Sequence, residues 1–391
     1  MSNLGTKFPK DASLKWVHPA HALSNPNVVI KEQFLDPDSD YANTFFQTAN
    51  NTVTFDIPKD LDEIVDMHII APITNGDASD TFTFGAPPQF MFDKWELLKG
   101  SDVVKTYKPL HAYLDDNLYY TSAEREHVEY ESRIDKSTRA MFSSANTIAA
   151  TASSDVYIHV PNIFTQCMIS PKQLKSQYRL RFYSSASYAL AASAAAVTDL
   201  TLGTLRMRVR HRVGHADKLA IQSRSDYRFL DTVATDISES LTSGTEKSII
   251  TKHFSDTDLY SHFMVLIRAS GAANEGLINF LPLTSIAIED EAGNNLTNGQ
   301  TYTSDQLLKN LYPQHFKNTM SIQSNRAVYV PLVASTDVVS DARKGTCSGA
   351  LNLRSNMRLR IVPAATATRQ IHMIAKKYAH VSIVGGDFVF H

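Results

Sequence analysis

A cysteine flanked by glycines is the first pattern in this sequence that could carry out a reaction. Residues Gly345 to Gly349 spell Gly-Thr-Cys-Ser-Gly, the form of a nucleophile elbow, with Cys347 as the nucleophile. Such an elbow needs a turn from a strand into a helix, whereas the surrounding residues predict β-structure with Gly- and Ser-rich connections. We therefore interpret this segment as a loop and predict no catalytic residue in the chain.

Three alternating carboxylates could bind a calcium ion. Asp36, Asp38 and Asp40 have this spacing. An EF-hand would continue with glycine at its sixth position and glutamate at its twelfth, where this chain has Tyr41 and Gln47. A solvated turn is the better interpretation, and weak calcium binding at contacts between subunits is the alternative that stays open.

Histidine pairs could bind zinc. His18 and His21 are three residues apart, and His211 and His215 are four apart, a spacing that suits a metal only on a helix. His211 belongs to an alternating strand pattern, in which residues four apart are roughly 13 Å from each other. We therefore predict polar contacts for these histidines, and neither a metal nor a cofactor for the protein.

Four arginines share one face of a predicted strand over residues 205–213, namely Arg206, Arg208, Arg210 and Arg212. They could contact packaged nucleic acid or acidic lipid headgroups. The alternative is salt bridges to acidic side chains of a neighbouring sheet or subunit. Because 38 basic residues face 40 acidic ones, for a net charge of −2, we favour salt bridges and predict no sequence-specific binding of nucleic acid.

Composition limits the class of protein. The 391 residues are 43% hydrophobic and 20% charged, which predicts a large folded core with a surface of neutral polar side chains. Cys167 and Cys347 are the only cysteines, so a disulfide framework is excluded and a reducing compartment is expected. No apolar run reaches ~18 residues, and Met1–Asn25 lacks the apolar stretch of a signal peptide. We expect a protein that is made without signal-peptide secretion.

The elements that must position these residues are mostly strands. Alternating runs rich in β-branched and aromatic residues predict strands at 53–57, 156–160, 178–182, 205–213, 263–267, 328–330, 357–361 and 380–384. Short helices are predicted at Asp60–Val65, Leu110–Tyr120, Pro171–Ser176 and Ser304–Leu311. Ser137–Ser154 and Ser184–Val197 are rich in small residues and predict long loops. The predicted strands and helices do not alternate along the chain, so we do not expect a parallel sheet.

An internal repeat is the most informative feature. Leu174–Phe182 resembles Leu353–Ile361 at an offset of 179 (353 − 174), with five of nine positions identical. Phe34-Leu35-Asp36 recurs as Phe229-Leu230-Asp231. Further matches in the same order join Glu96 with Glu289, Gly100 with Gly293, Asn117–Tyr119 with Asn310–Tyr312, and Val156-Tyr157 with Val328-Tyr329. The sequence therefore predicts two copies of one all-β unit, each the size of an eight-stranded jelly roll.

Two tandem jelly rolls in a chain of this length resemble the double jelly-roll major capsid proteins of tailless icosahedral viruses. The strand-turn Trp95–Gly100 precedes the helical Leu110–Tyr120, and the second copy repeats this order from Ile288 to Tyr312. Tyr378 and the Gly385-Gly386 pair match the last strands of that family. Lys377 stands where the family often has asparagine, and the Leu-Arg pair of the family is absent. The resemblance covers the chain from about Val28 onward.

The resemblance implies an all-β fold of two tandem eight-stranded jelly-roll β-sandwiches with short helices in loops. It divides the chain into an N-terminal arm (1–27), a first jelly roll (28–220) and a second (221–391). It implies a viral major capsid protein, not an enzyme, that forms pseudo-hexagonal homotrimers in an icosahedral shell and resides in the virion after assembly inside the host cell. The implied partners are further copies of itself, minor capsid or vertex proteins, and an internal membrane reached through the arm.

Two other functions remain open from the sequence. A carbohydrate-binding or carbohydrate-active β-sandwich would need an exposed aromatic platform, and only two tryptophans are present, with Trp95 inside a predicted strand. A viral receptor-binding spike would also be β-rich and trimeric. Oligomeric mass and particle shape distinguish these functions from a capsid subunit.

Overall fold

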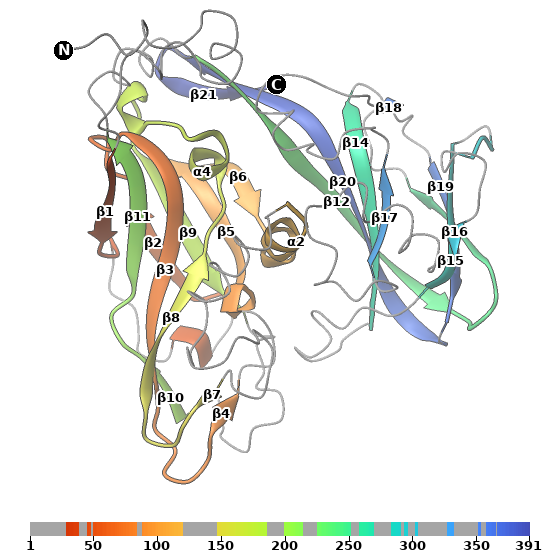
Figure 1. Ribbon diagram of the computed structural model, residues 1–391, viewed down its shortest axis with the longest axis horizontal. Coiled ribbons are helices and arrows are strands. Elements are labelled where there is room, and N and C mark those ends of the chain that lie inside the picture. Colours follow the sequence, from red (N-terminus) through yellow and green to blue (C-terminus); the bar gives the residue numbers. More distant parts are fainter. Residues whose placement is uncertain are drawn as a thin grey trace, which may run out of the picture.

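The computed structural model describes residues 29–38, 45–47, 50–83, 88–119, 147–185, 199–213, 225–251, 258–269, 283–290, 293–295, 302–303, 327–331, 351–352, 357–364 and 366–391. Within these ranges the chain forms two antiparallel β-sandwiches that lie beside each other (Figure 1). We call them the first and the second sandwich, in chain order. No helix in this part of the chain is long and apolar enough to cross a membrane.

The first sandwich consists of two four-stranded layers with small additions. One layer has the order β1 (Val29–Leu35), β11 (Arg206–Val213), β3 (Glu63–Asn75), β8 (Ser153–His159), with β10 (Leu200–Leu202) extending it beside β3. The other layer has the order β2 (Thr52–Asp56), β9 (Tyr178–Ser184), β5 (Phe92–Lys99), β6 (Asp102–Tyr107). The short strands β4 (Phe82–Thr83) and β7 (Thr147–Ile148) pair separately. The connections hold η2 (Phe45–Gln47), η3 (Pro88–Met91), α2 (Pro109–Tyr119), α4 (Ile163–Cys167) and η4 (Pro171–Gln173).

The second sandwich repeats this plan. One layer has the order β12 (Asp226–Leu241), β20 (Ala367–Val384), β14 (Leu259–Ala269), β17 (Ala327–Pro331), with β18 (Leu351–Asn352) on β14 and β21 (Asp387–Phe390) on β20. The other layer has the order β13 (Lys247–Thr251), β19 (Met357–Pro363), β15 (Leu283–Asp290), β16 (Tyr302–Thr303). In both sandwiches the first, last, third and sixth main strands therefore form one layer, and the second, seventh, fourth and fifth form the other. This order is that of a jelly roll.

The predicted repeat is confirmed at the level of strands. The Phe-Leu-Asp matches lie at β1 and β12, the Arg-Leu-Arg matches lie on β9 and β19, and the Val-Tyr matches lie on β8 and β17. Each pair of strands occupies the same place in the two sandwiches. The predicted boundaries after residues 27 and 220 fall outside the described residues and stay predictions.

Alternation explains the strands that the sequence predicts. Along β2, Val53 and Phe55 are fully buried while Thr52 and Asp56 are exposed, and along β9 every second side chain from Tyr178 is buried. All eight predicted strands coincide with strands of the structure. In strands such as β2 and β9, period-2 patterning places one face in the core and leaves the other polar.

Two strands are much longer than predicted and join the sandwiches. β12 has 16 residues and β20 has 18, and they pair along their whole length. Figure 1 shows this ribbon and β21 running beyond the second sandwich across the top of the first. Tyr227, Phe229 and Val381 from the ribbon belong to the core cluster of the first sandwich, and Phe388 packs against it. The ribbon therefore ties the two units into one body.

The helix predictions have mixed outcomes. The prediction at Leu110–Tyr120 is confirmed by α2, and Pro171–Ser176 is reduced to the single 3-10 turn η4. The prediction at Asp60–Val65 is wrong, because this segment is a turn that leads into β3. Its apolar residues continue as the alternating Ile64, Met67 and Ile69 of a core strand, which a six-residue window did not include. Ser304–Leu311 lies outside the described residues.

The predicted long loops are described only at their edges. Within Ser137–Ser154, residues 147–148 form β7 and β8 begins at Ser153, so that end of the predicted loop is partly strand. Within Ser184–Val197, Ser184 ends β9. Residues 137–146 and 186–197 lie outside the described part of the chain.

Candidate functional site: the junction between the sandwiches

The surface between the two sandwiches, which we call the junction, combines α2 and β6 of the first with β12 and β20 of the second. α2 begins at Pro109, a residue that suits the first turn of a helix, and buries Leu110, Ala112 and Leu114. Figure 1 shows α2 in the space between the sandwiches. Two of its polar side chains, His111 and Asp115, are thereby turned toward β12 and β20.

A buried lysine lies at the centre of the junction. Lys376 on β20 is 1% exposed, and its Nζ lies 2.5 Å from Asp115 Oδ1 on α2 and donates to Thr232 Oγ1 on β12 at 2.7 Å. A cation removed from water is costly unless an anion and hydrogen bonds replace the solvent. This pair therefore favours the one arrangement of the two sandwiches that keeps Asp115 beside Lys376.

A second ion pair crosses the same surface. Lys105 on β6 lies 2.5 Å from Asp231 Oδ1 on β12 and 4.7 Å from the centre of the Phe229 ring. Burial lowers the pKa of Lys105, and the nearby carboxylate of Asp231 opposes this effect. The ammonium group thus combines an anion with an aromatic face, both supplied by the other sandwich.

A further cluster in the junction contains the histidines His111 and His372. His372 Nδ1 lies 2.5 Å from Asp236 Oδ1, and Lys108 Nζ lies 3.7 Å from the other oxygen of Asp236. The hydrogen bond with His372 lowers the pKa of Asp236 to about 2. Burial, reinforced by the cations Lys376 and Lys108, lowers the pKa of His111 to about 3. At neutral pH His111 is therefore uncharged, among the cations Lys376 and Lys108, the carboxylate of Asp236 and the ring of His372.

Two hollows lie along the junction. A cavity of about 140 Å³ is lined by Trp95, Lys105, His111, Asp115 and Asp231 among others, and a more open cleft of about 320 Å³ lies beside it under Phe90 and His372. Charged side chains and the rings of Trp95 and Tyr107 both line the smaller cavity, whose size suits bound water.

The hairpin of β20 and β21 fastens the second sandwich to the far end of the first. Lys175 N donates to Gly386 O at 2.8 Å, and Phe388 N donates to the Tyr178 hydroxyl at 3.1 Å. Asp387 accepts from Ser176 Oγ at 2.6 Å and pairs with Lys99 at 2.8 Å. Gly385 and Gly386 have φ values of 63° and 92°, which the tight turn requires and which glycine adopts without strain. The glycine pair noted in the sequence therefore forms the turn between β20 and β21.

The repeated Glu and Arg residues form the same ion pair in each sandwich. Arg181 Nη2 lies 2.9 Å from Glu96 Oε2, and Arg360 Nη1 lies 2.8 Å from Glu289 Oε1. Burial alone would raise the pKa of Glu96, but hydrogen bonds from Lys94, Arg181 and Tyr183 outweigh it and lower the pKa to about 2. The sequence repeat therefore preserves an electrostatic contact as well as a strand.

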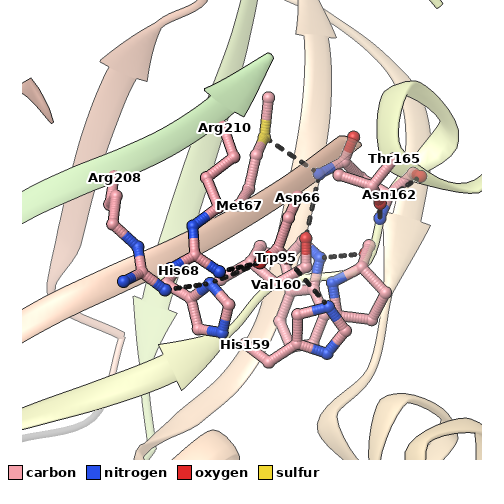
Figure 2. Close-up of polar contacts among 11 residues, drawn as sticks. Asp66, Met67, His68, Trp95, His159, Val160, Asn162, Thr165, Arg208 and Arg210 are labelled. Carbon is pink, nitrogen blue, oxygen red and sulfur yellow. Dashed lines mark hydrogen bonds and ion pairs between the residues drawn. The ribbon is translucent and has the colours of Figure 1, made fainter. Parts of the chain in front are cut away.

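A polar network occupies the face of β3 that is turned away from the core (Figure 2). Asp66 lies 3.2 Å from His68 Nδ1 and 3.4 Å from His159 Nε2, and Arg208 Nη2 lies 3.2 Å from His68 Nδ1. Burial lowers the pKa of His68. Burial would raise the pKa of Asp66, but the two histidines hold it well below the usual value. Figure 2 also shows Asn162, whose side chain accepts from Phe164 N and caps α4.

Three of the four arginines on one face of β11 form ion pairs, as predicted, but their partners lie in the same sheet. Arg206 faces Asp36 at 3.6 Å, Arg210 faces Glu32 at 2.7 Å, and Arg212 Nη2 faces Glu63 at 2.5 Å. These carboxylates lie on or directly after the adjacent strands β1 and β3 rather than on another sheet or subunit. Arg208 instead contacts His68 and lies over the Tyr157 ring.

The structure separates the other candidate residues. Asp36 and Asp38 pair with Arg206 and Arg179, respectively. His211 is buried in β11 and Cys167 is buried in α4. Among the described residues, no three His, Cys, Asp or Glu side chains are close enough to hold a metal ion. The remaining candidates (His18, His21, Asp40, His215 and Cys347) lie outside the described residues.

Sequence reasoning missed the junction residues themselves. The charged residues of the junction lie on four different elements, and no spacing in the sequence relates them; they are Lys105, Asp115, Asp231 and Lys376. One signal was present: Lys376 follows Ile371, Met373, Ile374 and Ala375 in a strand that is apolar on both faces. A charge in such a strand indicates that it is buried with a partner.

The fold is similar to solved structures of viral capsid proteins. The PBCV-1 virus capsid, in a quasi-atomic model, aligns with a TM-score of 0.65 and 14% identity over 93% of this chain and 96% of that chain. The Faustovirus major capsid protein aligns with a TM-score of 0.63 and 9% identity over 91% of each chain. The mavirus major capsid protein gives a TM-score of 0.51 and 11% identity over 100% of this chain and 95% of that chain. No family model and no curated protein matches the sequence. At these identities the likeness shows the fold, the double jelly roll.

Proposed function

We propose that this chain is a viral major capsid protein. The observation that supports this most strongly is the pair of sandwiches with one strand order, held together by a charged junction. Solved proteins that share this arrangement over more than nine-tenths of both chains include those of the PBCV-1 virus capsid and the major capsid proteins of Faustovirus and mavirus. A pair of similar units in one chain is what a six-sided tile made of three subunits requires.

The mechanism is geometric. Each subunit contributes two similar wedges, and three subunits in a ring place six wedges around one axis. The lattice then forms through contacts between such tiles, and the position of one wedge relative to the other decides whether the ring closes. The junction would therefore be the functional site of the subunit, because it sets that position through Lys376, Asp115, Lys105 and Asp231.

The proposal extends to partners and location. The subunit would reside in the virion, with further copies of itself as main partners. Minor capsid or vertex proteins, and an internal membrane reached by the arm of residues 1–27, complete the proposed partners. No catalytic role is proposed, and the neighbours in fold are structural proteins.

Trp95 bears on the carbohydrate-binding alternative. Its ring is 1% exposed, stacks with Tyr107 and donates to Pro161 O at 3.1 Å. A sugar platform needs an exposed aromatic face, so Trp95 does not supply one.

The test is the oligomeric state and shape of the purified full chain. Size-exclusion chromatography with light scattering should give about 130 kDa, three times 43.5 kDa, and negative-stain images should show flat six-sided particles. A protein that stays monomeric at every concentration, or an elongated trimer of spike shape, would contradict the proposal.

A further inference from the structure

Two histidines lie side by side at the open end of the β20–β21 hairpin. The two strands are antiparallel, and Val381 lies opposite Phe390. His380 and His391 continue this register by one pair, because His391 N donates to His380 O at 3.0 Å. Their ring centres are 4.2 Å apart, and the ring planes differ by 9°. Both residues are exposed, so the hairpin presents two imidazole groups to solvent at one place.

A chain of hydrogen bonds orients the ring of His391. Ser382 Oγ donates its only proton to Asp226 Oδ1 at 2.7 Å. The contact of 3.2 Å between Ser382 Oγ and His391 Nε2 therefore requires that Nε2 carries the ring proton and donates it. In the neutral ring the lone pair is then on Nδ1. Metal-binding histidines are held in a similar way, with one nitrogen on the metal and the other donating to a polar group that fixes the ring.

We propose that His380 and His391 bind one divalent transition-metal ion of the class of Ni²⁺, Cu²⁺ and Zn²⁺, with water molecules as the remaining ligands. Imidazole nitrogen suits these ions, whereas Ca²⁺ and Mg²⁺ take oxygen ligands. Two nitrogens that each lie about 2.1 Å from one ion are at most about 4.2 Å apart. The stacked rings have this separation, and a small rotation of two exposed side chains turns both lone pairs toward one ion.

The charges beside the pair select the kind of cation. Asp226 lies on β12 opposite Ser382 and supplies a carboxylate on one side. Arg228 lies opposite His380, and its positive charge disfavours a cation that is held by charge alone. An ion that binds here must therefore gain from its bonds to nitrogen. This requirement favours the ions with the highest affinity for nitrogen ligands, of which Cu²⁺ is the strongest.

The ion would connect the two strands that fasten the second sandwich to the first. His380 belongs to β20 and His391 follows β21, whose residues Asp387 and Phe388 contact the first sandwich. A ligand that binds only the folded protein raises the free energy of unfolding, so the ion would stabilise this attachment. No spacing in the sequence indicated the site, because the two histidines are 11 residues apart (391 − 380) and only the hairpin brings them together.

Titration of the purified full chain with Ni²⁺ at neutral pH tests the inference. Calorimetry should show that the unchanged protein binds one more ion per chain than His380→Asn does. This ion should also raise the melting temperature of the unchanged protein more than that of His380→Asn. His111→Asn is the matched control, since His111 lies in the junction beside the cations Lys376 and Lys108 and offers no place for a metal ion. It should bind as many ions as the unchanged protein, and far-UV circular dichroism verifies that each variant is folded.

Ser382→Ala distinguishes a built metal site from two histidines that merely stack. It removes the hydroxyl that holds His391 Nε2, so it should weaken Ni²⁺ binding at this site about 10-fold while both imidazoles remain. Equal numbers of bound ions in His380→Asn and the unchanged protein would overturn the inference, and unchanged affinity in Ser382→Ala would overturn the assignment of Nδ1 as the ligand atom. Neither measurement depends on trimer formation, so this inference and the proposed function fail independently.

Discussion

Lys376 is the residue on which the relative position of the sandwiches depends most directly. Its ammonium group is enclosed between α2 and β12 and has Asp115 and Thr232 as partners. A buried pair adds little net stability compared with apolar residues of the same size, but removing one member leaves the other in a poorly solvated place. The pair therefore contributes specificity of arrangement more than free energy.

The first prediction follows from this asymmetry. Lys376→Ala should lower the free energy of unfolding by about 3 kcal/mol, because Asp115 keeps its charge without its main partner. Lys376→Met combined with Asp115→Leu should recover most of this loss. Lys247→Ala, which removes the exposed pair with Glu239, should cost less than about 1 kcal/mol. Urea unfolding measures all three, and equal effects of the two single alanine variants would refute the prediction.

His111 makes the junction sensitive to acid. Its pKa is about 3 in the fold, against 6.5 for the unfolded chain, so below pH 6.5 the unfolded chain binds a proton that the folded chain does not. The free energy of unfolding therefore falls as the pH drops from 6.5 toward 3, by at most about 2 kcal/mol at about pH 5. Asp236 adds a further loss at lower pH, because its pKa of about 2 lies below its usual 3.8.

The second prediction isolates this histidine. His111→Asn should reduce the difference in urea midpoint between neutral pH and about pH 5, since the replacement does not titrate. His380→Asn, at an exposed histidine of β20 stacked on His391, is the matched control for a histidine-to-asparagine change outside the junction. If both variants retain the full pH dependence, the acid sensitivity has another origin.

At the scale of elements, the β20–β21 hairpin carries the contact that is most sensitive to a single methyl group. A Cβ at Gly386 would lie 2.5 Å from Lys175 Cγ, and the φ of 92° disfavours any other residue. A Cβ at Gly385 would meet nothing within 4 Å, and its φ of 63° lies in the left-handed region. The two adjacent glycines thus differ in surroundings more than in backbone.

The third prediction uses this difference. Gly385→Ala should cost about 1 kcal/mol, the strain of a left-handed residue, and Gly386→Ala about 2–3 kcal/mol, because Lys175 must also move. Thermal unfolding monitored by fluorescence should show the order, with the larger fall in melting temperature for Gly386→Ala. The same fall in both variants would show that the hairpin does not pack tightly on Lys175.

The strands were predictable from sequence because each is a run of three to nine residues rich in β-branched and aromatic side chains, and most of them alternate between apolar and polar residues. The length of β12 and β20 was not, since their middle parts are apolar or polar on both faces, as in Ile371–Ala375. The segment Asp60–Val65 resembled a helix because its pattern belongs to a strand that begins at Glu63. The burial of Lys376 had a signal in the sequence, but its partner had none: Lys376 and Asp115 are brought together only by the docking of two complete sandwiches.

At the scale of the molecule, the duplication explains why one chain can present related surfaces twice. The Glu96–Arg181 and Glu289–Arg360 pairs show that electrostatic contacts persist with the strand order. The environments differ, however: the outer face of β12-β20-β14 is covered within the chain, whereas Ile30 and Phe34 of the corresponding layer are exposed.

The strand order also has a consequence for synthesis on the ribosome. In each sandwich the last strand of the layer, β11 or β20, lies between the first and the third. Among the described strands, β1 pairs only with β11 and β12 only with β20, so their partners are complete once Arg206–Val213 and Ala367–Val384 have emerged. A nascent chain therefore carries these first strands unpaired for most of the translation of each sandwich, a state that invites aggregation and slow folding. Yield in a host should consequently depend on elongation rate and on chaperones that hold extended segments.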